Sequence, residues 1–234
     1  ETDMLFRFAA GGYYQAPYYR EIKSLDGSLD NSIKAQKSLH FVLANDYEFA
    51  WKDRPFKLTT ELYYKKMSNL MPYYMDNMRI RYSGKNNAKG YAYGMDARLF
   101  GEFVPGVDSW ISVGYSRIYE NIDNKGFIPR PTDQRFRVSM FYQDYMPKFP
   151  SMRVNLTLVY ASGLPTGTPI LFNADGTPNF DTAYHFQKIL TSYKRVDIGL
   201  TKIFIDQKDY KPKSVFWSKF KELSLGVQVF NAFN

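Results

Sequence analysis

Residues able to catalyse a reaction or to bind a metal are few in this sequence. It contains no cysteine and only two histidines, His40 and His185. The missing thiols exclude a disulfide scaffold, a thiolate zinc site and cysteine catalysis. Asp175 and Asp181 lie near His185 in the chain, but their spacing matches no ordered calcium loop. We therefore expect no metal site and no cofactor, and we interpret His40 as a polar residue of a strand.

Patterns typical of enzymes are also missing. The sequence has no glycine-rich phosphate loop, no nucleophile elbow and no pair of candidate catalytic carboxylates. An enzyme inside a barrel would need a nucleophile and a base at one rim, and the two histidines do not visibly provide them. We therefore expect that the chain is not an enzyme.

The net charge of +8 raises the question of nucleic-acid binding. Lysine and arginine are spread along the chain, however, and form one dense group only: Lys208, Lys211, Lys213, Lys219 and Lys221. A single basic stripe is absent, so no nucleic-acid partner is expected. The lysine group is better placed at an aqueous rim or beside anionic lipid headgroups.

The elements that must position any site are indicated by strict alternation of apolar and polar residues. In 56–64, for example, the residues at even positions are mostly apolar, and Lys57, Thr59 and Glu61 stand between them. A period of two is that of a strand whose two faces meet different surroundings. No stretch of 18 uninterrupted apolar residues occurs, which excludes a membrane-spanning helix.

Nine strands are predicted from this alternation. Their expected ranges are 4–15, 38–51, 56–70, 88–103, 109–119, 134–145, 151–162, 193–205 and 223–231. Strands of soluble domains usually have about 5–6 residues, whereas a tilted strand needs about 9–11 residues to cross the hydrocarbon layer of a bilayer. The predicted strands are long enough to cross.

The predicted connections alternate between long and short. The short ones, 52–55, 104–108 and 146–150, contain proline, and the first two also contain aspartate or glycine, as tight turns require. An antiparallel meander with long loops on one side and tight turns on the other is typical of outer-membrane barrels. The connection from Asp206 to Glu222 departs from this rule, because it is long where a short turn is expected.

The aromatic content is high, with 20 Tyr, 19 Phe and 3 Trp. Many of these residues lie near predicted strand ends, as in Tyr13-Tyr14, Tyr18-Tyr19, Tyr63-Tyr64, Tyr73-Tyr74, Tyr119, Tyr142 and Tyr145. Tyrosine presents an apolar ring to lipid and a hydroxyl to water or headgroups. We interpret these clusters as the aromatic girdles of a membrane barrel.

Charged residues of both signs fall on the polar side of the predicted strands. As candidates for a lumen wall or a plug-facing surface we select Glu61, Asp96, Arg98, Arg135, Arg137, Arg153, Arg195 and Asp197. They form either a solvated wall whose charges pair across strands or a surface that docks a plug or lines a solute path. A second group lies in a long connection and mixes aromatic and charged residues: Tyr73, Tyr74, Asp76, Arg79 and Arg81. That group either faces a ligand or forms a two-stranded extension above the membrane.

Several segments resemble the C-terminal half of the barrel of TonB-dependent outer-membrane receptors, in particular the subgroup with a carboxypeptidase-regulatory-like N-terminal domain. The resemblance covers nearly the whole chain and depends on order and spacing. The segments are Gly12–Pro17, Gln36–His40, Glu61–Lys65, Asn69–Tyr73, Asp76–Tyr82, Gly101–Gly106, Ile128–Arg135 and Tyr193–Gly199.

The resemblance implies a fold and a function. The fold is all-β: a transmembrane up-and-down antiparallel barrel of 22 strands, of which residues 1–234 would supply about nine, without the plug domain and without the last strand or strands. The function is import of a scarce solute, either a siderophore or other metal chelate, a glycan or a peptide, with energy from the TonB system. The expected location is the outer membrane of a Gram-negative cell. Expected partners are outer-membrane lipid, the receptor's own plug, the TonB complex and a surface lipoprotein.

Two other classes of protein share some of these sequence features. A non-transporting structural or adhesive outer-membrane barrel would have the same strands, and long loops alone would serve it. A soluble β-sandwich would need polar outward faces, whereas one face of almost every predicted strand is apolar or aromatic.

Overall fold

The computed structural model describes residues 3–23, 28–76, 79–146, 148–167, 173–174, 187–206, 214 and 216–233, except for the side chains of 74–76, 166–167 and 187–188. Within this part the chain is all-β. Nine long strands pair in sequence order in one antiparallel sheet. They are β1 (Asp3–Gln15), β2 (Gln36–Trp51), β3 (Arg54–Leu70), β6 (Ala88–Val104), β7 (Val107–Ile122), β9 (Phe136–Met146), β10 (Phe149–Ala161), β13 (Tyr193–Asp206) and β14 (Glu222–Val229).

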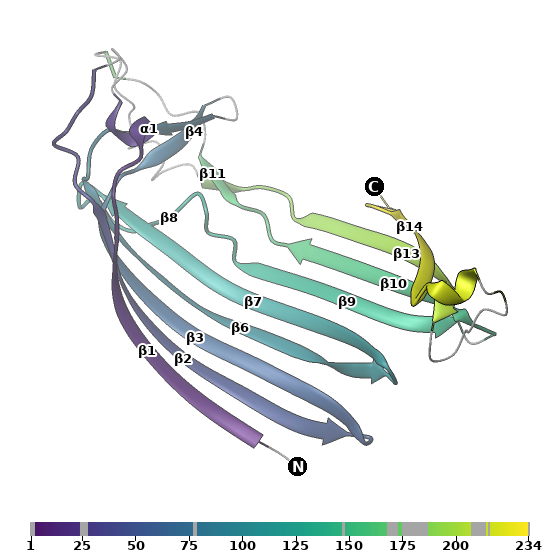
Figure 1. Cartoon of the computed structure of the whole chain (residues 1–234). Coiled ribbons are helices and arrows are strands. Elements are labelled where there is room, and N and C mark those ends of the chain that lie inside the picture. The colour runs from purple at the N-terminus through teal and green to yellow at the C-terminus, as the bar shows by residue number, and fades with distance from the viewer. Residues whose placement is uncertain are drawn as a thin grey trace.

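Every one of the nine predicted strands is present, and most differ from the prediction by one to three residues at an end. The sheet is curved, and each strand lies beside the strands that precede and follow it in sequence (Figure 1). The sheet is open: β1 pairs only with β2 and β14 pairs only with β13 among the described residues. No helix in the described part of the chain is long and apolar enough to span a membrane.

Short elements complete the fold. They are α1 (Tyr19–Ile22), β4 (Tyr73–Asp76), β5 (Arg79–Tyr82), β8 (Ile128–Pro129), β11 (Pro165–Gly167), β12 (Gln187–Ile189) and the 3-10 helix η1 (Trp217–Lys219). Strands β4 and β5 form a hairpin, as do β11 and β12, and β8 pairs with the end of β7. Figure 1 shows α1, β4 and β11 at one end of the sheet, which we call the loop end, and the short turns at the other, the turn end.

The turn end is built by local backbone chemistry. Lys52 and Asp53 connect β2 to β3 with φ of 53° and 58°, the left-handed pair of a two-residue hairpin turn. Pro105 and Gly106 connect β6 to β7, and Gly106 has a φ of 76°. Proline followed by a left-handed glycine is the signature of a type II turn. These turns fix the register, because a slip of one residue would exchange the two faces of the sheet.

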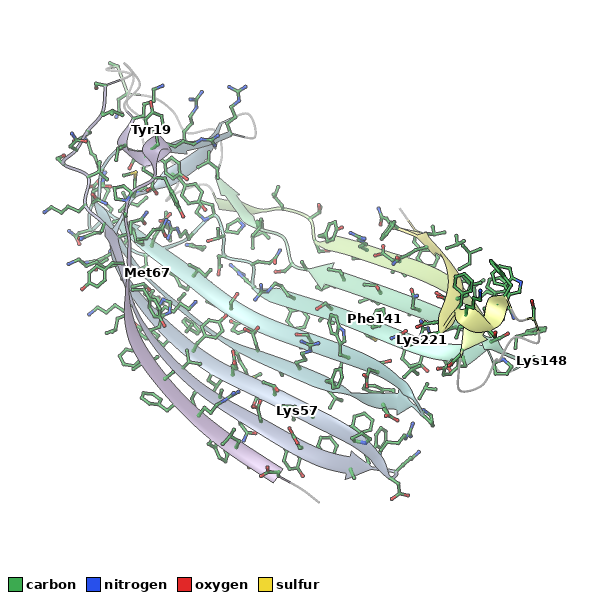
Figure 2. All side chains as sticks on the ribbon, in the orientation of Figure 1. Tyr19, Lys57, Met67, Phe141, Lys148 and Lys221 are labelled. Carbon is green, nitrogen blue, oxygen red and sulfur yellow. The ribbon has the colours of Figure 1, made fainter. Side chains whose placement is uncertain are left out.

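The register separates the side chains into an apolar and a polar face. One line of paired residues on the apolar face runs across six strands through Leu58, Leu99, Ile111, Met140, Leu158 and Val196. Another line on the same face, four residues further along β3, includes Leu43, Leu62 and Met95, which are 47%, 50% and 47% exposed. The side chains of both faces are drawn in Figure 2.

Aromatic side chains border this apolar face at both ends. Toward the loop end, the Tyr91 ring centroid lies 5.3 Å from that of Tyr119 and 5.0 Å from that of Phe127. Toward the turn end, the Phe49 ring centroid lies 5.1 Å from that of Tyr47 and 5.8 Å from that of Phe56. We call these two groups the loop-end and turn-end aromatic belts.

Three of the tyrosines assigned to girdles from the sequence lie on the other face. Tyr13 pairs with Ser38, Tyr63 pairs with Gly94, and Tyr145 pairs with Arg153, all on the polar face. The girdle interpretation was wrong for these three, because adjacent residues of a strand point to opposite faces and a Tyr-Tyr pair supplies one ring to each.

Candidate functional site

A hollow of about 430 Å³ opens on the polar face at the loop end. Its volume lies within the range usual for small-molecule sites. The walls come from β1, β2 and β3 and from the segments above them. The lining residues are Tyr13, Tyr14, Gln15, Tyr18, Glu21, Gln36, Lys37, Ser38, His40, Met67, Leu70, Met71, Tyr73, Tyr82 and Arg130.

The floor of the hollow follows from strand alternation. Tyr13, Ser38, His40 and Met67 share the polar face because the register pairs Tyr13 with Ser38 and Ser38 with Met67. The Tyr13 ring centroid lies 4.4 Å from that of His40. In the fold, His40 is thus part of an aromatic pair, and the described residues contain no group of His, Asp and Glu able to hold a metal ion.

One side of the hollow is closed by the connection that follows β1. Glu21 of α1 is 5% exposed and accepts hydrogen bonds from the Tyr18 backbone N–H at 2.8 Å and the Gln36 Nε2 at 3.0 Å. The first bond caps α1 and the second joins it to the start of β2. Because both carboxylate oxygens have a donor, the buried Glu21 is stabilised and holds the connection beside the hollow.

The opposite side is formed by the β4–β5 hairpin. The Tyr73 ring centroid lies 6.2 Å from that of Tyr82, and the Arg130 guanidinium lies over the Tyr73 ring at 5.5 Å from its centroid. Burial raises the pKa of the Tyr73 phenol, an effect that the positive charge of Arg130 partly opposes. The phenol therefore stays protonated near neutral pH and can donate a hydrogen bond.

Arg130 belongs to a segment, residues 128–135, that is anchored on the loop end of β7. Asp133 is the centre of this anchor, with a side chain that is fully buried. Its Oδ1 accepts a hydrogen bond from the Ile118 backbone N–H at 2.7 Å. Its Oδ2 lies 3.5 Å from Arg117 Nε and 3.6 Å from Arg135 Nε. Asp133 thus joins the segment to β7 through one hydrogen bond and the ion pair with Arg117, and the ion pair with Arg135 lies within the segment.

A second buried carboxylate, Glu120, lies on the loop side of the loop-end aromatic belt. Its Oε2 is 3.4 Å from Arg130 Nε, and its side chain is 3% exposed. Burial raises the pKa of the Glu120 carboxyl, although Arg130 acts in the opposite direction. The cost of removing the charge from water therefore exceeds the attraction to Arg130.

The Glu120→Gln variant should be at least as thermally stable as the parent protein at neutral pH. A carboxyl whose pKa is raised by folding binds more protons in the folded state, so its contribution to stability falls as pH rises from its usual value through the raised one. The amide carries no charge and removes this pH dependence. The check is the unfolding midpoint of both proteins in detergent between pH 4 and pH 8, where the curves should converge at the acidic end. The prediction is wrong if the stability of the variant, measured relative to the parent, is lower at pH 7 than at pH 4.

The five residues predicted to face a ligand are distributed unevenly. Tyr73 lines the hollow. Arg79 and Arg81 are exposed on β5, and alternation places them on the opposite side of that strand from Tyr82. Tyr74 and Asp76 lie in β4, but their side chains fall outside the described part of the structure. The pairing of β4 with β5 gives the two strands that the alternative interpretation expected.

Seven of the eight candidates for the wall lie on the polar face of paired strands. Arg135 precedes β9, and its carbonyl accepts a hydrogen bond from the Ser116 N–H at 3.0 Å. Charge pairing explains part of the set: Arg195 donates three hydrogen bonds of 2.8, 3.0 and 2.7 Å to Asp197, and Arg137 Nη2 lies 3.8 Å from Asp96. Arg98 stacks over Trp110 at 4.9 Å.

Two wall candidates are less well paired. Glu61 lies opposite Asp96, so two like charges are neighbours across β3 and β6. The Nε of Arg153 is buried and has no hydrogen-bond partner within the described residues. Sequence reasoning did not select four further charges that form a network at the edge of the sheet. In it Arg7 lies 2.9 Å from Asp46, and Lys57 lies 2.9 Å from Glu48 and 3.8 Å from Asp46.

Most residues of the hollow were missed from the sequence. Tyr13 and Tyr18 were assigned to girdles, and Glu21 and Arg130 were not selected. Two sequence signals could have found them. Strand alternation places Tyr13 and Tyr14 on opposite faces, and carboxylates and arginines occur together in and around 128–135. His185, Asp175 and Asp181, the weighed alternative for a metal, lie outside the described residues.

Comparison with known proteins adds no assignment: no protein-family model matches the chain, and no curated protein matches its sequence.

Proposed function

We propose that this sheet is part of the wall of an outer-membrane β-barrel that imports a scarce solute as a TonB-dependent receptor. The observation that carries the proposal is the contrast between the two faces. One face is mainly apolar between two aromatic belts, and the other carries charges of both signs. This is the distribution expected when one face meets lipid and the other an aqueous interior.

The exposure of the apolar face supports a lipid environment. Leu43, Leu62 and Met95 are neighbours in register, and about half of each side chain is accessible. Burying such a side chain contributes about 1.5–3 kcal/mol, so a face lined by many of them is costly in water. Soluble monomers rarely expose contiguous apolar patches of this kind, whereas a bilayer solvates them.

The two unpaired edges support closure by further strands. In the described part, the outer edges of β1 and β14 have no hydrogen-bonded neighbour. A bilayer does not tolerate unpaired backbone groups, because each costs several kcal/mol there. We therefore infer that other strands complete the barrel. Because several segments resemble TonB-dependent receptors, we take the complete barrel to have 22 strands around a plug.

The hollow supports a receptor that binds a solute at its loop end. Tyrosine rings, a cation and hydrogen-bonding groups converge there, at the mouth of the polar face. A purely structural or adhesive barrel would share the two faces, but it would have no need of this arrangement. We assign the hollow as the place where the solute first contacts the wall.

Substitutions in the hollow test the import proposal. In full-length protein, Tyr73→Ala and Tyr82→Ala should each lower solute binding about tenfold or more, since truncating an aromatic hot spot costs about 2 kcal/mol or more. Ile80→Ala, on the same hairpin but not lining the hollow, is the matched control. The measurement is growth and binding with ferric chelates, oligosaccharides and peptides supplied one at a time. A deletion strain that grows like the parent on all of them would favour the non-transporting barrel.

A further inference from the structure

The connection between β13 and β14 carries an exposed aromatic cluster at the turn end. Phe216, Trp217 and Phe220 pack on one another, with ring centroids 5.2, 5.9 and 5.7 Å apart. They nevertheless remain 60%, 44% and 42% exposed. Three large aromatic side chains at one surface site are an apolar patch of the kind that usually meets a partner.

Local backbone bonds give the cluster its shape. The Ser218 N–H donates to the Ser214 carbonyl at 2.9 Å, and the Phe220 N–H donates to the Trp217 carbonyl at 3.1 Å. The resulting turn of η1 places Phe216, Trp217 and Phe220 around one centre. The cluster is therefore formed before any partner binds, which lowers the entropic cost of binding.

The charge in the connection that carries the cluster is mainly positive. Between residues 207 and 221 the sequence has five lysines and one aspartate. Lys219 and Lys221 alternate with the aromatic residues and are exposed. Figure 2 shows Lys221 at the same end of the sheet as Lys148 of the β9–β10 turn. Aromatic side chains with lysines between them are complementary to a bilayer surface, in which an anionic headgroup layer covers the apolar acyl chains.

We propose that the Phe216–Trp217–Phe220 cluster, with Lys219 and Lys221, binds the anionic headgroup layer of the phospholipid bilayer at the turn end. The proposal rests on the proposed function, since it requires that the apolar face of the sheet lies in lipid. The aromatic rings enter the interface and the lysines bind lipid phosphates. This connection is longer than the other turns at this end, and lipid binding would explain its length.

The test uses full-length protein reconstituted into vesicles of phosphatidylcholine alone or with phosphatidylglycerol. A fluorescent label on Ser218→Cys reports the cluster, and a label on Leu62→Cys reports insertion of the apolar face. Brominated lipid should quench the label at 218 in phosphatidylglycerol vesicles and much less in neutral ones. Lys219→Gln and Lys221→Gln should each lower the ratio of docked to undocked cluster about fivefold. Lys52→Gln, a lysine beside exposed Trp51 at the same end, should leave the label at 218 unchanged.

The outcomes separate the two proposals. If lipid quenches the label at 62 but not the label at 218 in either kind of vesicle, the lipid contact of the cluster is wrong. The cluster would then bind a protein partner or a second copy, and the proposal of a membrane barrel would still hold. Equal quenching at 218 in both vesicles, unaffected by the glutamine variants, would overturn recognition of anionic lipid. A label at 62 that no lipid quenches would overturn membrane insertion itself.

Discussion

Replacing Leu62 by arginine is expected to destabilise the bilayer-inserted protein by about 2–4 kcal/mol, the cost of an arginine on the lipid face near the bilayer centre. Leu62 lies on the apolar face between the two aromatic belts, with Leu43 and Met95 as its cross-strand neighbours. The measurement is the urea dependence of folding of the full-length protein into phospholipid vesicles. In a water-soluble sheet the same change would be nearly neutral, because Leu62 is 50% exposed.

Leu5→Arg is the matched control for this experiment. Leu5 is 54% exposed, so the two leucines are equally accessible, but Leu5 pairs with Asp46 on the polar face. An arginine there would lie beside a carboxylate and is expected to change stability by less than about 1 kcal/mol. Equal effects of the two substitutions would remove the distinction between the faces on which the membrane proposal depends.

The strands could be predicted from the sequence because their signal is local and repeated. In 56–64 most residues alternate in polarity, and the tight turns at Lys52-Asp53 and Pro105-Gly106 mark where the chain reverses. With alternation and turns known, sequence-order pairing of antiparallel strands follows. The charged candidates on the polar face were found by the same reasoning, since parity alone decides the face of Arg98 or Arg137.

The hollow could not be predicted in the same way, because its walls depend on how irregular segments fold over the strands. Glu21 is buried only because α1 turns back to Gln36, and Arg130 reaches Tyr73 only because Asp133 fixes its segment on β7. These contacts join residues far apart in the chain, and they carry no periodic signal. The Tyr13-Tyr14 pair shows the limit of composition: both rings were assigned to a girdle, although alternation required that only one lie on the apolar face.

Removal of the Asp133 carboxylate should have the largest effect on the loop end of the sheet. Asp133→Ala leaves the Ile118 N–H without its acceptor and Arg117, whose side chain is 19% exposed, without its counter-ion. Arg135 is 40% exposed and contributes less, because water screens its charge. Together the lost contacts should cost about 3 kcal/mol. Asp108→Ala, which removes an exposed aspartate of β7, should change stability by less than about 0.5 kcal/mol.

Hydrogen exchange at Ile118 measures this loss where it occurs. In Asp133→Ala the Ile118 amide should exchange about a hundredfold faster, because the segment 128–135 then opens locally while the distant strands stay paired. Asp133→Asn retains an oxygen that can accept from the Ile118 N–H but lacks the charge that faces Arg117, so its exchange rate should fall between the two. If Asn and Ala accelerate exchange equally, the ion pairs hold the segment and the hydrogen bond adds little. If neither accelerates it, the segment is held by its backbone bonds to β7, such as that from the Arg130 N–H to the Ile118 carbonyl at 2.9 Å, and Asp133 is not its anchor.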